Sequence, residues 1–180
     1  MNLFNNKFTA RAVTAGYVFI IYLTTGLMGS VQVWLRQRGF LTVASGLLLV
    51  AGAGVAVYFI VARLGRRKPK HLVILAASAA AYFVLSVKFA KTPSDRIHLL
   101  EYSLLAALAY YTVKFNVKGW PAYPGAWLLA TMAGLMDEAI QRFLPNRAAD
   151  MRDFLVNAIS AAVALLVVRL VIEENDEVET

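Results

Sequence analysis

Charged residues are missing from two long stretches near the start of the chain. No charged side chain occurs between Arg11 and Arg36, and none occurs between Arg38 and Arg63. Both stretches exceed the about 20 residues that a helix needs to cross the hydrocarbon layer of a membrane. The apolar pattern of the whole chain predicts six transmembrane helices, at roughly 12–34, 40–62, 71–88, 97–115, 123–143 and 153–172. We therefore expect an all-α, polytopic membrane helix bundle.

Composition supports this class of protein. Apolar and aromatic residues make up 59% of the chain and charged residues only 16%, with a mean hydropathy of +0.60. A soluble domain normally has about 25% charged residues. The chain is basic, with a formal net charge of +7, but most basic residues lie between the apolar stretches, where they meet lipid headgroups. Membrane lipids are therefore the expected partners, and nucleic acid is not. Because there is no Cys, disulfides and thiolate chemistry are excluded.

The predicted helices fall into two groups and a tail. Residues 1–88 are expected to form an N-terminal membrane scaffold of three helices, and residues 89–172 a core of three helices. The third helix is short and alanine-rich, which suggests either a packed helix inside the bundle or a re-entrant segment. Residues 173–180 form an acidic tail, which we interpret as solvated.

The basic loops predict the orientation. The densest basic cluster lies between the second and third predicted helices, at 63–70. Loops of this kind face the cytoplasm. With six crossings, both termini are then cytoplasmic.

Polar residues occur inside the last three predicted helices. His98, Glu101 and Tyr102 share one helix face because they are three and four residues apart. Two further groups end the fifth helix and begin the sixth: Asp137, Glu138 and Gln141, then Arg147, Asp153 and Asn157. By the predicted topology all three groups lie at the outer end of the bundle. A charged side chain at mid-membrane costs about 2.5–3.5 kcal/mol, so such residues indicate a site unless they only connect helices.

These residues suggest two kinds of role. The candidate acids and bases are His98, Asp137 and Glu138, since adjacent carboxyl groups in a site of low dielectric constant favour proton transfer. The candidate ligand-binding residues are Arg96, Glu101, Tyr102, Gln141, Arg147, Asp153 and Asn157. Hydrogen bonding between helices is the structural alternative, above all for Gln141, Asp153 and Asn157. No dense ligand motif supports a metal site, and we expect no metal and no cofactor.

Taken in order, the polar residues resemble a known family, the VanZ-like integral membrane proteins of bacteria. The resemblance covers about residues 88–168 and rests on three motifs: Asp95-Arg96-x-His98-x-x-x-Tyr102-x-x-Leu105, Asp137-Glu138-x-x-Gln141-x-Phe143-x-x-x-Arg147 and Asp153-x-x-x-Asn157. Two positions depart from the family pattern, which often has Lys at Arg96 and Gly at Ser160. The resemblance implies a multi-pass protein of the bacterial cytoplasmic (inner) membrane with a link to glycopeptide (teicoplanin) resistance and the cell envelope. It implies no particular reaction.

Three functions fit these residues. The first is a binding protein, acting as an accessory subunit, whose polar pocket near the outer face takes a lipid-linked or anionic envelope component. The second is an intramembrane enzyme that acts on an envelope lipid by acid/base chemistry. The third is a small transporter, although no inverted repeat is evident. The partners to expect are membrane lipids, a lipid-linked envelope intermediate or a glycopeptide, and a larger membrane complex or a second copy of the chain.

Overall fold

The computed structural model describes residues 4–27, 29–90, 92–144 and 151–174. These residues are almost entirely helical and contain no strand, which confirms the all-α bundle. The helices are α1 (Lys7–Leu27), α2 (Gly29–Gln37), α3 (Phe40–Tyr58), α4 (Pro69–Val84), α5 (Pro93–Val113), α6 (Ala122–Gln141) and α7 (Met151–Val167). Three of them continue without a break into a π-helical turn: α3 into η1 (Phe59–Arg63), α4 into η2 (Leu85–Phe89) and α7 into η3 (Val168–Ile172).

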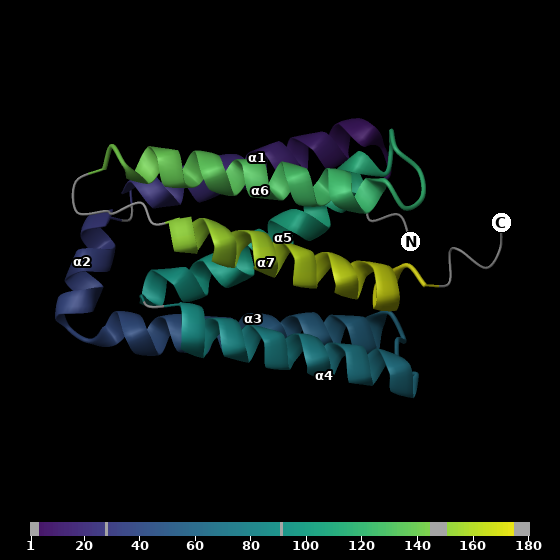
Figure 1. Ribbon diagram of the computed structural model, residues 1–180, viewed down its shortest axis with the longest axis horizontal. Helices are drawn as coiled ribbons and strands as arrows, with labels where there is room; N and C mark the ends of the chain where they lie inside the picture. Colours follow the sequence, from purple (N-terminus) through teal and green to yellow (C-terminus); the bar gives the residue numbers. More distant parts are fainter. Residues whose placement is uncertain (1–3, 28, 91, 145–150, 175–180) are drawn as a thin grey trace.

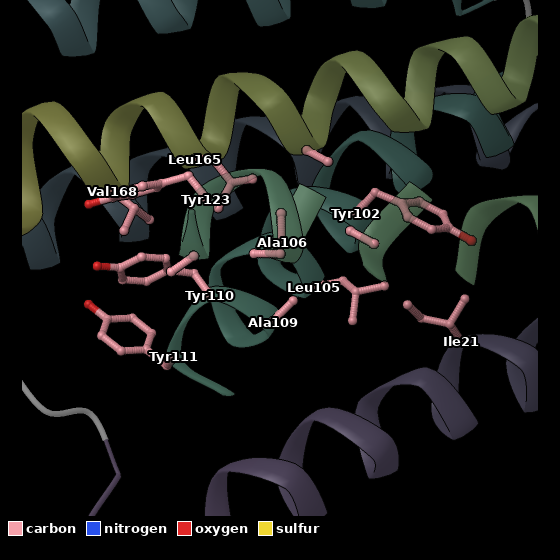
Figure 2. Packing of buried hydrophobic residues seen from close by; sticks show 14 residues of the cluster. Ile21, Tyr102, Leu105, Ala106, Ala109, Tyr110, Tyr111, Tyr123, Leu165 and Val168 are labelled. Atoms are coloured by element: carbon pink, nitrogen blue, oxygen red, sulfur yellow. The ribbon is translucent and has the colours of Figure 1, made fainter. Parts of the chain in front are cut away.

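Helix α5 is the centre of the bundle. It packs against α1, α3, α6 and α7, and in Figure 1 α1 and α6 lie on one side of the α5–α7 pair while α3 and α4 lie on the other. Small side chains allow this close packing, because Ala106 and Ala109 of α5 and Ala126 and Ala130 of α6 are all fully buried. Figure 2 shows the two alanines of α5 between the aromatic rings and leucines of the same core.

The outer surface of the bundle is apolar. The exposed side chains of α3 include Val43, Leu47 and Val50, and α6 exposes Trp127 and Met132, while its buried face carries small and polar residues. A protein that places apolar groups outside and polar groups inside is adapted to a lipid environment rather than to water. The bundle is therefore a membrane protein.

The structure qualifies the predicted count of six membrane helices. Within the described residues, four helical segments are long and apolar enough to cross a membrane by length and composition: Lys7–Gly26, Phe40–Arg63, Pro69–Phe89 and Met151–Ile172. Helices α5 and α6 are 21 and 20 residues long and run alongside these four, but their polar residues keep them below that criterion. The reason is that α5 is enclosed by other helices, so its side chains need not be apolar on every face.

The first predicted helix ends earlier than expected. The range 12–34 predicts a continuous helix, but α1 ends at Leu27 and the separate nine-residue helix α2 follows. Glycines at 26 and 29 flank the break, and glycine is a poor helix former. Helix α2 runs across the end of the bundle, where the Arg38 guanidinium lies 4.3 Å from the centre of the Trp34 ring.

The alanine-rich helix α4 lies at the edge of the bundle. We expected it to pack inside, yet Ala76, Ala77, Ala79 and Ala80 are exposed. Together with η2 it is long and apolar enough to cross the membrane, so the re-entrant alternative is not supported. The central position belongs to α5 because its alanines come with tyrosines, Ser103 and His98 that pair with other helices, whereas α4 offers mainly an apolar surface.

The first two residues of the acidic tail are packed against the bundle, not solvated as predicted. Glu173 is only 5% exposed and accepts hydrogen bonds from the Tyr111 hydroxyl at 3.2 Å and the Lys114 ammonium at 2.8 Å. Glu174 pairs with Lys70 and with the buried His71. The hydrogen bonds from His71 and from Lys70 lower the pKa of Glu174 to about 2. Glu173 and Glu174 therefore connect the end of η3 to α5 and to the basic loop.

Candidate functional site

Three helix ends that carry the predicted polar residues meet at one end of the bundle. Figure 1 shows the start of α5, the end of α6 and the start of α7 at the same end, close to α2. The basic loop at 63–70, the start of α1 and the end of η3 lie at the opposite end. The structure therefore places the helix ends that carry the polar groups at the same end of the bundle, as the sequence predicts.

The start of α5 is fixed by a helix cap. The Thr92 side chain accepts a hydrogen bond from the Asp95 backbone N–H, and the Asp95 carboxylate accepts one from the Thr92 backbone N–H at 2.9 Å. Pro93, at the first helical position, fits the same arrangement. Asp95 is therefore explained by capping, and the cap fixes where the helix that carries His98 and Tyr102 begins.

Asp137 is the centre of the polar cluster. Its side chain has 0% exposure, and its Oδ2 accepts hydrogen bonds from the Tyr102 hydroxyl and the Gln141 amide, each at 3.2 Å. Figure 2 shows the Tyr102 hydroxyl pointing away from those of Tyr110 and Tyr111, toward the other end of the bundle. The structure therefore brings together three of the predicted residues from α5 and α6.

His98 lies beside two carboxylates. Its Nδ1 is 3.0 Å from Glu101 Oε2 and 3.9 Å from Asp137 Oδ2. The imidazole is 6% exposed, and its ring centre is 5.9 Å from that of Tyr102. His98, Glu101 and Asp137 thus form one polar cluster inside the bundle.

Asn157 of α7 faces the same region. A Cβ atom added at Gly134 would lie 3.2 Å from Tyr102 Cε1 and 3.6 Å from Asn157 Cβ, so α5, α6 and α7 meet closely at that glycine. Asn157 is 1% exposed, and within the described part of the chain neither its Oδ1 nor its Nδ2 has a hydrogen-bond partner. The same holds for Oδ1 of Asp137. Buried polar atoms without a partner are rare and costly, so these three atoms need an explanation.

The remaining predicted residues are placed less centrally. Glu138 is buried at 6% exposure, and Asp153 is half-buried near the start of α7. Arg96 is half-buried and points toward α3, because its guanidinium lies 3.9 Å from the position of a Cβ at Gly46. Its Nε is buried and has no hydrogen-bond partner in the described ranges. Arg147 lies outside the described residues.

Two aromatic residues near the site carry contacts that the sequence did not indicate. The Tyr22 hydroxyl of α1 donates to the Ala133 carbonyl at 3.0 Å. The Trp127 indole donates to the Ala158 carbonyl at 2.9 Å and so joins α6 to α7 beside Asn157. Tyr22 lies in a stretch without charges, so no sequence signal distinguished it from a lipid-facing aromatic.

The arrangement can bind polar groups and move protons, but it offers no ready metal centre. Among the described residues, no group of three or more His, Asp or Glu side chains could hold a metal ion. What the cluster does offer is one carboxylate held by two donors, one imidazole beside it, and one buried amide. These groups can receive hydrogen-bonding parts of a ligand.

Comparison with known proteins gives one result. No curated protein and no solved structure matches the chain significantly. The sequence model of the VanZ/LLP1 family matches residues 3–172, which extends well before the motifs that carried the resemblance and includes α1 to α4. The match covers nearly the whole chain and agrees with the polar motifs of α5, α6 and α7. The chain therefore belongs to the VanZ/LLP1 family.

Proposed function

We propose that this VanZ/LLP1 protein binds a lipid-linked or anionic component of the cell envelope at the polar end of its bundle. The observation that carries this proposal is the cluster around Asp137, with three buried polar atoms that have no hydrogen-bond partner among the described residues. In a protein whose outer surface is apolar, such atoms are unfavourable unless a ligand or water meets them. A lipid reaches a membrane-embedded site from the side, with its headgroup at the depth of the helix ends.

The Arg96 guanidinium supports an anionic ligand. Its Nε is buried without a partner among the described residues, and the side chain lies where α5 approaches α3 at Gly46. A guanidinium binds phosphate or carboxylate with two parallel hydrogen bonds. Arg142 lies at the same end of the bundle, but its side chain is exposed. The two arginines therefore form a matched pair for testing specific against general attraction to lipid.

Lipid analysis of the purified protein tests this function. We expect wild-type protein in mild detergent to retain one class of envelope lipid above its share in the membrane. Arg96→Gln should retain about tenfold less of it, because a charge-assisted hydrogen bond is lost, while Arg142→Gln should behave like wild type. Mass spectrometry of the extracted lipid measures both. If wild-type protein carries only bulk lipid, in the same proportions as Arg96→Gln, the proposal is wrong.

The site faces the outer leaflet in this proposal, with both termini in the cytoplasm of a bacterium. The basic loop at 63–70 lies at the opposite end of the bundle, and basic loops stay on the cytoplasmic side. Because the natural chain has no Cys, single cysteines report sidedness directly. A membrane-impermeant maleimide should label Arg142→Cys in intact cells and Lys118→Cys only after permeabilisation. The reverse pattern would put the site on the cytoplasmic side.

One observation favours an enzyme as the second candidate. His98 lies 3.0 Å from Glu101 and 3.9 Å from Asp137, an arrangement in which an imidazole can exchange protons with a bound substrate. The same lipid analysis separates the two functions. Lipid that is recovered unchanged after prolonged incubation supports binding, whereas lipid that is altered by wild-type protein but not by His98→Gln supports catalysis.

A further inference from the structure

The three unpartnered atoms differ in what they require of a ligand. Oδ1 of Asp137 can accept hydrogen bonds, and the Asn157 amide offers Oδ1 as an acceptor and Nδ2 as a donor. Both side chains are at most 1% exposed; Asn157 Cβ lies 3.6 Å from the position of a Cβ at Gly134, and Asp137 follows Gly134 by three residues on α6. A group that satisfies these atoms must therefore donate hydrogen bonds.

The charges around these atoms also favour a hydrogen-bond donor over an anion. Among the described residues, the acids beside these atoms are Glu101, Asp137 and Glu138, and the basic group within 4 Å of Asp137 is the imidazole of His98, while Arg96 points toward α3. Glu138 is 6% exposed and follows Asp137 directly, so both carboxyl groups are in a poorly solvated region. A phosphate or carboxylate brought next to Asp137 would be repelled, because like charges repel each other strongly in a region of low dielectric constant.

We propose that the deep end of the site receives the amine or hydroxyl groups of a headgroup, while the phosphate stays nearer the helix ends. The inference rests on the proposed binding of an envelope lipid and adds the chemical class of the part that reaches Asp137 and Asn157. A primary amine or a polyol supplies N–H or O–H donors to the acceptors on both residues. A quaternary ammonium has the same charge as the amine but no donor, so it cannot replace it.

A methylation series of phospholipids tests the donor requirement. Phosphatidylethanolamine, its monomethyl and dimethyl derivatives and phosphatidylcholine, with identical acyl chains, carry three, two, one and no N–H groups at constant charge. Each is added to delipidated protein, and binding is followed by native mass spectrometry. We expect a fall of about tenfold or more at the last methylation, since the last donor is lost there, and smaller changes before it.

The Asn157→Leu variant supplies the structural control. Leucine has the same branched skeleton, with two methyl groups in place of the amide oxygen and nitrogen, and Asn157 makes no hydrogen bond in the described structure that its removal could break. We expect its thermal unfolding temperature to be equal to or higher than that of wild type, and its preference for ethanolamine over choline to disappear. Asn116→Leu is the matched control at the opposite end, where the amide accepts from Arg11, and it should keep the preference.

The outcomes separate this inference from the proposed function. Phosphatidylcholine binding as tightly as phosphatidylethanolamine would overturn the donor requirement and leave lipid binding intact. No retention of any lipid by wild-type protein would overturn the proposed function itself. A lower unfolding temperature of Asn157→Leu together with an unchanged lipid preference would show that the amide only connects helices, and would also overturn the inference.

Discussion

The Asp137→Asn variant should bind its lipid about 10- to 100-fold more weakly than wild type and should remain folded. The asparagine oxygen can still accept from Tyr102 and Gln141, whose hydrogen bonds to Oδ2 are 3.2 Å long. The other position becomes an NH₂ group, which donates where the carboxylate accepted. The loss corresponds to about 1.5–3 kcal/mol for a hydrogen bond to a charged group.

Stability and binding should change independently in this variant. Burying an ionised carboxylate in a membrane protein is unfavourable, so the neutral amide should not lower the unfolding temperature. Glu174→Gln removes an acid at the opposite end and serves as the charge-matched control for binding. If Asp137→Asn unfolds at a lower temperature but binds lipid normally, the carboxylate has a structural role and the site is not centred on it.

Replacing Gly134 by Val should destabilise the bundle by about 1–3 kcal/mol, because extra atoms are forced into a packed contact. A Cβ at this position would lie 3.2 Å from the Tyr102 ring and 3.6 Å from Asn157 Cβ. The Tyr102 ring would have to move, and with it the hydroxyl that holds Asp137. We therefore expect lower thermal stability in detergent and weaker lipid binding in the same variant.

Gly54→Val gives the comparison that isolates packing from helix propensity. Gly54 is also in a membrane helix, but nothing lies within 4 Å of a Cβ built there. This variant should have the unfolding temperature of wild type within a few degrees. Equal effects of the two substitutions would mean that α5, α6 and α7 do not meet at Gly134 as described.

The positions of the membrane helices were largely predictable from the sequence. Charges flank α3 and α4 closely, and the predicted ranges 40–62 and 71–88 differ by few residues from Phe40–Arg63 and Pro69–Phe89. The break between α1 and α2 was missed because no charged residue marks it. Which helix lies at the centre was also missed, since alanine-rich stretches are equally compatible with packing in a core and with facing lipid.

The candidate site was predictable as a location but not as a set of contacts. The spacing of His98, Glu101 and Tyr102, combined with the topology, indicated which helix ends would meet. The sequence could not indicate that Tyr102 donates to Asp137, or that Arg96 points toward α3 instead. Such pairings depend on helix rotation and on the distance between axes, which the hydropathy pattern does not determine.

The buried Glu173 was missed for a related reason. In the sequence it begins a run of acidic residues, which is typical of a solvated tail. Its partners Tyr111 and Lys114 are about 60 residues earlier, at the end of α5. Only the return of α7 along α5 brings them together, and that arrangement has no local signal.

Photo-crosslinking with a headgroup-labelled lipid tests the central claim most directly. A phosphatidylethanolamine analogue with a small diazirine in its headgroup would be added to wild-type protein in nanodiscs, and the crosslinked residues identified by mass spectrometry. The account predicts crosslinks within 95–102, 137–141 and 152–157, which unlabelled phosphatidylethanolamine competes away and Asp137→Asn reduces. Crosslinks spread over the exposed faces of α3 and α4, unaffected by that substitution, would contradict it.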